Sequence, residues 1–542
     1  MDKIFYNGTI KTMDKATPYV EAVAVQDGVI LHLGNYEDIV KFRTENTEMI
    51  DLEGNFMLPG FIDSHLHTVE INRNRRLLDM KDAKTFEDAL ALIAQRDREM
   101  NEKGQEGWLI GILFNENDWS DKKEVPNRLD LDSVCSDRPC CIQRVCGHTV
   151  SYNTKALELC GIMNEKPGET KRNMDFFPDG TPQGQMYEND GWTFLRYQPV
   201  PSVEYFKECF ALESAEYAKK GLVAVHTGDI NQLNPVKDNA NILQAYKEAA
   251  EEGLLTSRLY VWLRCEQADL LKLMVKAYPF GTTFGPDKKV KTVCVKQLMD
   301  GSLGAHSGYM RHGYLNDPDA ANVSTHTDEE INELADIANA AGYPLVAHCI
   351  GDAAVEQLLN AFEYSQHKHP MANIRNGVMH CQIMGDDQVD RMARDGILAY
   401  VQPVFLRSDA AIVDDCVGVE IGKQSYNWRR MLDKGLHVIG GSDCPIESND
   451  PINNIYYAVT RDGGNGKPWN PEAAMTVEEA IAAFTIEGAY AAYEEQRRGS
   501  ISAGKYADFV VLDRNLMEID PWTIRDTKVL MTVIDGKIVY KA

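Results

Sequence analysis

The chain of 542 residues is long enough for one large domain with a smaller one, or for two to four domains of ordinary size. Hydrophobic residues make up 44% of the sequence and charged residues 25%, which is typical of a globular protein. The formal net charge of -26 opposes binding to nucleic acid and to anionic membrane surfaces, so we expect neither as a partner.

The cellular setting is indicated by the cysteines and by the lack of long apolar runs. The first eight residues contain no apolar stretch typical of a signal peptide, and no run elsewhere reaches membrane-spanning length. Twelve cysteines without a CxxC pair do not form a dense disulfide framework in a chain of this size. We therefore expect a reducing, cytoplasmic location.

Short strands are predicted at both ends of the chain. Asn7-Gly8, Asp27-Gly28 and Asp535-Gly536 are hairpin-type turn signals that follow apolar stretches. Because the two ends carry the same pattern, we expect residues 1–57 and 496–542 to form one small composite β-sandwich domain.

The middle of the chain, residues 58–495, alternates apolar strand-like runs with amphipathic helix-like stretches. This alternation predicts a (β/α)8 TIM-like barrel of buried parallel strands. An open, doubly wound sheet is the alternative, but no GxGxxG motif follows an early strand. The eight candidate strands span residues 57–62, 222–226, 258–263, 290–298, 344–347, 377–380, 397–401 and 436–440.

A long gap separates the first two candidate strands. Residues from about 70 to 215 contain helix-like and turn-rich stretches, and an unstructured loop of this length is implausible. We predict an insertion with its own structure that rises from the carboxyl-terminal face of the barrel. It would serve as a lid and specificity element.

A pair of histidines ends the first apolar run, where residues 58–67 read LPGFIDSHLH. Residues two apart in a strand face the same side, so His65 and His67 would present two imidazoles to one point. Such a pair alone is a weak sign of a metal site.

Four further polar residues lie at or near predicted strand ends. His348 and His380 end two apolar runs, Asp443 follows a third, and Lys296 lies inside a fourth. Each residue alone has an ordinary structural explanation as a packed histidine, a turn residue or a lysine that reaches outward to water. Together with the histidine pair, they would converge at one end of a barrel, so we predict a metal site.

These residues resemble the pattern of the amidohydrolase superfamily of metal-dependent hydrolases. That pattern has His-x-His on strand 1, Lys or Glu on strand 4, His on strands 5 and 6, and Asp on strand 8. The matching segments are residues 58–67 and 499–509. Three further segments resemble the branch that contains N-substituted formamide deformylases, and they are residues 147–149 with Asn153, 300–304 and 442–445.

The resemblance implies a set of metal ligands. His65, His67 and Asp443 would bind the more buried metal, and His348 and His380 would bind a second one. Imidazole and carboxylate ligands suit Zn²⁺, with Mn²⁺, Co²⁺ and Fe²⁺ as alternatives.

The number of metals depends on Lys296 in this interpretation. A free ammonium group cannot act as a ligand, so Lys296 would bridge two metals only as a carbamate formed with CO2. Without that carboxylation, we expect one metal. The neighbouring Gln297 would face the opposite side of the strand.

The implied reaction is attack by a metal-activated water on a carbonyl carbon. Asp443 would accept a proton from that water and pass it to the leaving amine, while His380 or His148 would stabilise the oxyanion. His148 has a structural turn role as an equal alternative. Weaker candidates for the site are His226, His306, His312, Glu188 and Asn115.

Three functions remain open from the sequence. The leading hypothesis is hydrolysis of an amide, N-acyl or N-formyl C–N bond in a small molecule. A deaminase or cyclic-amide hydrolase on the same scaffold is the second, and a non-catalytic, metal-stabilised protein is the third. A homodimer is an expectation from the family resemblance.

Overall fold

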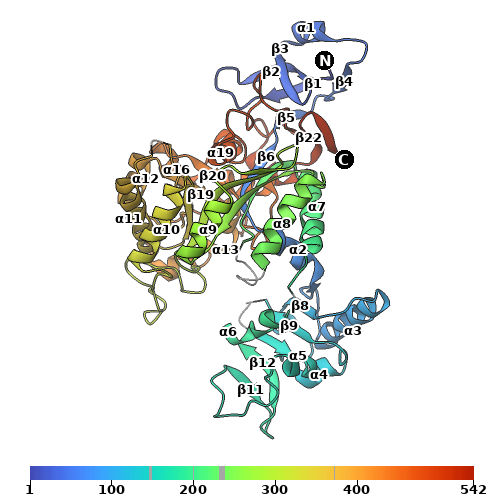
Figure 1. Cartoon of the computed structure of the whole chain (residues 1–542), viewed down its shortest axis with the longest axis vertical. Helices are drawn as coiled ribbons and strands as arrows, with labels where there is room; N and C mark the ends of the chain where they lie inside the picture. The colour runs from blue at the N-terminus through green and yellow to red at the C-terminus, as the bar shows by residue number, and fades with distance from the viewer. Residues whose placement is uncertain (146–148, 199, 231–237, 372) are drawn as a thin grey trace. The chain divides into compact units, whose positions relative to one another are not determined.

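The computed structural model describes residues 1–145, 149–198, 200–230, 238–371 and 373–542. The chain forms two compact units (Figure 1). Unit 1 comprises Met1–Glu70, Val203–Gln232 and Ala240–Ala542, and unit 2 comprises Ile71–Ser202 and Leu233–Asn239.

Eight parallel strands of unit 1 form one sheet, in which each strand pairs with the next along the chain. The first and last strands meet through a parallel bridge between Leu66 and Cys444. This arrangement confirms the predicted (β/α)8 barrel rather than an open sheet. The strands are β6 (Phe61–Leu66), β13 (Leu222–Thr227), β14 (Arg258–Arg264), β16 (Val290–Leu298), β17 (Leu345–Cys349), β18 (Gly377–His380), β19 (Leu398–Val401) and β20 (Val438–Gly440).

Helices separate most of the barrel strands, and their ends carry clear sequence signals. Helix α10 begins at a capping box made by Thr327 and Glu330, and α12 ends at Gly396, whose φ is 66°. The longer helices of unit 1 are α7 (Val203–Lys219), α8 (Asp238–Glu251), α9 (Ala268–Ala277), α10 (Asp328–Ala340), α11 (Asp352–Lys368), α12 (Asp386–Asp395) and α17 (Pro451–Thr460). The shorter ones are α1 (Tyr36–Ile39), α13 (Leu406–Asp409), α14 (Val413–Val417), α15 (Val419–Gly422), α16 (Trp428–Asp433), α18 (Val477–Ala483) and α19 (Ile486–Ala491).

The first predicted strand, residues 57–62, is wrong as a single element. The chain instead forms β5 (Phe56–Pro59), which belongs to the terminal domain, and then β6, which belongs to the barrel. Gly60 lies between them, and a larger residue would not fit there because a Cβ would lie 2.1 Å from Val223 Cγ1. Strand β6 also runs on to Leu66, so His65 lies inside the strand.

Strands from both ends of the chain form the terminal domain (Figure 1). Phe5, Val23, Phe509 and Val533 belong to one apolar core in this domain. The structure therefore confirms the predicted composite β-sandwich. Besides β5, its strands are β1 (Lys3–Lys11), β2 (Tyr19–Gln26), β3 (Val29–Gly34), β4 (Glu48–Asp51), β21 (Phe509–Leu512), β22 (Val529–Ile534) and β23 (Lys537–Lys541).

One of the three predicted turns in this domain is wrong. Asp27-Gly28 and Asp535-Gly536 connect consecutive strands with positive φ, as expected. Asn7-Gly8 instead lies within β1, where the register to β2 shifts and Asn7 has a φ of 60°. The left-handed preference of asparagine therefore serves a β-bulge here.

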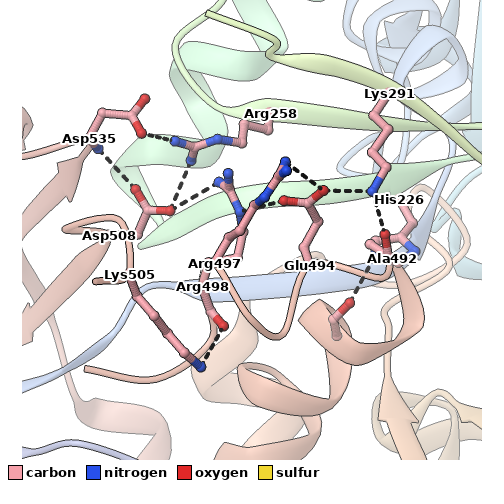
Figure 2. A network of polar contacts seen from close by, with 11 residues as sticks. His226, Arg258, Lys291, Ala492, Glu494, Arg497, Arg498, Lys505, Asp508 and Asp535 are labelled. Atoms are coloured by element: carbon pink, nitrogen blue, oxygen red, sulfur yellow. Dashed lines mark hydrogen bonds and ion pairs between the residues drawn. The ribbon is translucent and has the colours of Figure 1, made fainter. Parts of the chain in front are cut away.

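Buried ion pairs join the amino-terminal end of the barrel to the terminal domain (Figure 2). One carboxylate oxygen of Asp508 accepts from Arg258 Nη1 at 3.1 Å and from Arg498 Nη1 at 3.2 Å. Arg258 also contacts Asp535, and the side chains of Arg258 and Asp508 are only 2% and 3% exposed. Asp508 thus bridges two guanidinium groups, each of which also contacts a second carboxylate, Asp535 for Arg258 and Glu494 for Arg498.

Unit 2 has a sheet and an apolar core of its own. Helix α3 (Phe86–Glu102) begins at Thr85, whose side chain accepts the N–H of Asp88. The shorter helices of unit 2 are α4 (Arg128–Asp132), α5 (Thr154–Leu159) and α6 (Glu188–Gly191). The strands of unit 2 are β7 (Leu78–Asp79), β8 (Leu109–Phe114), β9 (Cys140–Arg144), β10 (Thr149–Tyr152), β11 (Met174–Phe176) and β12 (Pro182–Tyr187). Helix α7, which falls in the expected insertion, lies in unit 1.

Across the described residues, no helix combines the length and apolar character needed to cross a bilayer. The eleven cysteines that the structure describes form no disulfide with one another.

Candidate metal centre

The first and last barrel strands bring His65, His67 and Asp443 together. His65 lies on β6, His67 follows that strand, and Asp443 follows β20. Asp443 Oδ1 lies 3.0 Å from His65 Nε2 and 3.1 Å from His67 Nε2. One ligand atom from each of the three residues lies within 4.8 Å of the others, which is a spacing that one metal ion can span.

Backbone contacts between β6 and the segment after β20 hold this geometry. The backbone N–H groups of His65 and Ser442 both donate to Asp63 Oδ1 at 3.0 Å. The backbone N–H of Asp443 donates to His65 O at 2.7 Å. Gly441 permits this approach because a Cβ there would lie 2.7 Å from His65 N. Asp443 has a φ of 58°, a left-handed conformation that these bonds maintain.

His67 is oriented by its other ring nitrogen, which lies 2.9 Å from Gly228 O. A carbonyl oxygen only accepts hydrogen bonds, so Nδ1 carries a proton, and Nε2 faces Asp443 as the nitrogen that is available to a metal ion. The residues that follow His67 are also held in place, since Asp229 accepts the backbone N–H of Val69 at 2.8 Å. Two acceptors that face each other at 3.1 Å need a proton or a metal ion between them, so this pair fits a cation.

The ionisation states of His65 and Asp443 suit metal binding, whereas His67 shares a proton with Asp443 that a metal ion would displace. Burial and the positive charge of Lys296 lower the pKa of His65 to about 3, so this imidazole is neutral. Burial raises the pKa of Asp443, but the two histidines outweigh it and hold the pKa well below its ordinary value. Burial likewise opposes charge on His67, yet the hydrogen bond to Asp443 raises its pKa.

A second group of donors lies beside the first. His348 on β17 and His380 at the end of β18 have ring centres 4.4 Å apart, and His380 lies 6.2 Å from the ring of His65. Lys296 Nζ lies 5.4 Å from the centre of the Trp262 ring, which stacks on His65 at 5.0 Å. The structure therefore brings all six residues of the predicted ligand set to one end of the barrel.

Lys296 and His380 contain buried polar atoms without partners. Within the described ranges, Lys296 Nζ and both ring nitrogens of His380 accept or donate no hydrogen bond. A buried polar group in this state costs about 1–3 kcal/mol, so these atoms fit a cation and its bridging ligand. Burial lowers the pKa of Lys296 to about 8, and burial together with His348 lowers the pKa of His380 well below its ordinary value. A fraction of the lysine is therefore the uncharged amine, which is the form that reacts with CO2.

Comparison with known proteins decides the family. The model of the Amidohydrolase family matches residues 48–540. The chain belongs to this family. It is 32% identical over 549 residues to the putative amidohydrolase YtcJ of Bacillus subtilis (strain 168), with 100% of both chains covered.

One further relative and one solved structure are similar to the chain along nearly its whole length. The chain is 24% identical over 565 residues to the N-substituted formamide deformylase of Arthrobacter pascens, with 100% of this chain and 98% of that protein covered. An uncharacterized metal-dependent hydrolase from Pyrococcus horikoshii OT3 shares the fold, with a TM-score of 0.79, 23% identity, and 96% and 99% coverage of the two chains. Family membership supports metal-dependent hydrolysis of a C–N bond as the general reaction class.

The remaining predicted residues of this amidohydrolase have other places in the structure. His148 lies outside the described residues. His226 packs in the barrel core and its Nε2 lies 3.2 Å from Gly488 O, so it is a core residue. His306 pairs with Asp317 at 3.0 Å beyond strand β16.

Three weaker predictions are placed by their local structure. Asn115 caps a short helical turn in unit 2. Glu188, also in unit 2, is the first residue of α6. His312 is exposed in unit 1. As expected, Gln297 faces away from the ligands, since its Nε2 donates to Cys265 O at 2.9 Å.

The sequence reasoning missed the carboxylates that support the ligands. Asp300 Oδ1 lies 3.0 Å from His348 Nδ1, and Asp63 binds the backbone of two strands. The sequence did contain a sign of this role for Asp300, because a carboxylate next to a glycine follows Lys296 by four residues.

Proposed function

We propose that this amidohydrolase cleaves an amide, N-acyl or N-formyl bond of a small molecule with a metal-activated water. The observation that carries the proposal is the convergence of His65, His67 and Asp443 at the carboxyl-terminal ends of barrel strands. Similarity along the whole chain to an N-substituted formamide deformylase supports N-formyl amines as the first substrate class to test.

Two metal positions follow from the donor atoms. His65, His67 and Asp443 would hold the first ion, and His348 and His380 would hold the second. Nitrogen and carboxylate donors of this kind suit Zn²⁺. A divalent ion bound there supplies a water of lowered pKa and polarises the substrate carbonyl.

Lys296 determines whether one or two ions are held. Its neutral amine would add to CO2 with formation of an N–C bond and loss of a proton, which would yield an anionic carbamate. The carbamate would offer two oxygens as ligands in place of an amine whose nitrogen has no hydrogen-bond partner among the described residues. Without this modification, the first position alone would be filled.

Asp443 handles the protons of the reaction. Its carboxylate is ionised near neutral pH and lies beside the proposed position of the metal, so it can take a proton from the attacking water. It then donates this proton to the leaving nitrogen as the C–N bond breaks. His380 or His148 would assist the developing oxyanion.

Aromatic side chains line the ligands and exclude bulk water from them. Trp262 stacks on His65, and Phe405 stacks on His380 with ring centres 5.8 Å apart. Exclusion of water by these side chains would strengthen the electrostatic interactions of the reaction because the local dielectric is low.

A substrate screen of the metal-loaded full chain tests the proposal. It compares N-formyl amines and N-acyl amines with aminopurines and cyclic amides, and it detects released amine, carboxylate and ammonia. We expect amine and carboxylate from the first two classes, and a rate lower by about 10²–10⁴-fold for Asp443→Asn. Ammonia alone would favour a deaminase, ring opening a cyclic-amide hydrolase, and no turnover a non-catalytic metal protein.

A further inference from the structure

Asp300 is a buried carboxylate held entirely by N–H donors at the end of strand β16. Its side chain is 0% exposed. Oδ1 accepts from His348 Nδ1 at 3.0 Å and from the N–H of Ile350 at 3.0 Å. Oδ2 accepts from the N–H groups of Gly351 at 2.8 Å and Tyr309 at 3.0 Å.

The contact with Asp300 selects one tautomer of His348. An ionised carboxylate only accepts hydrogen bonds, so Nδ1 of the imidazole carries the proton. Nε2 then keeps its lone pair and is the ligand atom of this residue. The same carboxylate fixes the turn after β17 through Ile350 and Gly351, so the ring orientation and the backbone that carries it are set together.

The fourth donor, Tyr309, belongs to the segment between β16 and α10. Its carbonyl accepts the N–H groups of Ala353 and Ala354 at 3.1 and 3.2 Å, at the start of α11. Gly351 permits this packing because a Cβ there would lie 2.0 Å from Tyr309 O. In addition, the N–H of Arg311 donates to Asp352 at 2.8 Å. Residues 300–314 are therefore linked by hydrogen bonds to the ligand His348 through the carboxylate of Asp300.

We propose that Asp300 is a positioning residue that couples the metal position at His348 and His380 to the order of residues 300–314. The imidazole of His348 would become more positive if its Nε2 held a metal ion, and its Nδ1–H would then bind Asp300 more strongly. The position at His65, His67 and Asp443 is supported by Asp63 instead. The inference rests on the metal centre of the proposed function.

Asp300→Asn is the variant that tests the coupling. The amide nitrogen replaces one acceptor with a donor, so the cluster loses acceptor bonds while side-chain volume is kept. Asp317→Asn is the matched control, because Asp317 also pairs with a histidine, His306, at 3.0 Å beyond β16. That pair does not include a proposed metal ligand.

Two measurements on the full chain provide the readouts. The first is titration of the chelator-treated protein with Co²⁺ in bicarbonate, followed by its absorption spectrum. The second is hydrogen exchange of peptides covering residues 300–314, with and without Co²⁺. For the wild type and Asp317→Asn, we expect two binding steps and slower exchange when metal is bound. For Asp300→Asn, we expect the weaker step to lose about 10–100-fold in affinity and the metal-dependent protection to disappear.

The outcomes separate this inference from the proposed function. A wild-type chain that binds no Co²⁺ contradicts the metal centre itself. Normal metal binding with unchanged exchange in residues 300–314 overturns the coupling, and this result needs no variant. Asp300→Asn that matches the wild type in both readouts also overturns it, as does a wild type that binds one ion only.

Discussion

Replacing Gly441 with alanine should disturb the metal position where the barrel closes. The added Cβ would lie 2.7 Å from His65 N and 3.0 Å from His65 Cβ, whereas an ordinary contact begins at 3.4 Å. One of the two segments must therefore move by about 0.7 Å, and this displaces Asp443 relative to His65. Overpacking of this kind costs about 1–3 kcal/mol of stability, and a misplacement near 1 Å costs about 10²-fold in rate.

Gly228→Ala is the matched control, because its Cβ would lie 3.5 Å from His67 Cε1, which is an ordinary contact. The assay measures metal per chain by elemental analysis and the free energy of unfolding of the metal-free chains in urea. We expect Gly441→Ala to lose metal and stability while Gly228→Ala stays near the wild type. Equal behaviour of the two variants would refute the close approach of the strand β20 segment to His65.

Three further predictions concern stability, pH and the lysine. Asp508→Asn should lower the free energy of unfolding in urea by about 1–3 kcal/mol, because Arg258 and Arg498 lose the buried carboxylate between them but keep their contacts with Asp535 and Glu494; a loss below about 0.5 kcal/mol would contradict this. Burial lowers the pKa of His226 from 6.5 to about 3, so between these values the unfolded chain binds a proton that the folded chain does not. Stability should therefore fall as the pH drops through this range, by up to about 1.4 kcal/mol per pH unit from this residue, and His226→Gln should show a shallower slope; equal slopes would refute the assignment. Finally, a second equivalent of metal should bind only in preparations made with bicarbonate, and equal metal content with and without it would argue against a carbamate on Lys296.

The barrel was predictable because its buried strands are continuous apolar runs separated by helix-like stretches. The boundary at Gly60 was not predictable, since the apolar run continues across two different sheets. Strand β5 pairs with β21 and strand β6 with β13, and both partners are distant in sequence. Asn7-Gly8 shows a related limit, because a preference for left-handed backbone fits a turn and a bulge equally well.

The ligands could be predicted from the sequence because they lie at the ends of recognisable strands, and parallel strands end on one face of a barrel. Their supporting contacts depend on long-range register instead. Asp63 binds the N–H of Ser442 from 379 residues away, and Asp300 binds His348 across neighbouring strands. No local pattern encodes such pairs, so the structure was needed to find them.

If His65, His67 and Asp443 hold a divalent ion that hydrolysis of a C–N bond requires, removal of the ion must abolish the reaction. Elemental analysis of the purified chain, together with hydrolysis of a substrate from the screen before and after treatment with a chelator, measures this directly. We expect at least one divalent ion per chain, loss of hydrolysis when it is removed, and recovery when Zn²⁺ is returned. Hydrolysis that continues at full rate in the metal-free chain would show that the reaction does not need the ion.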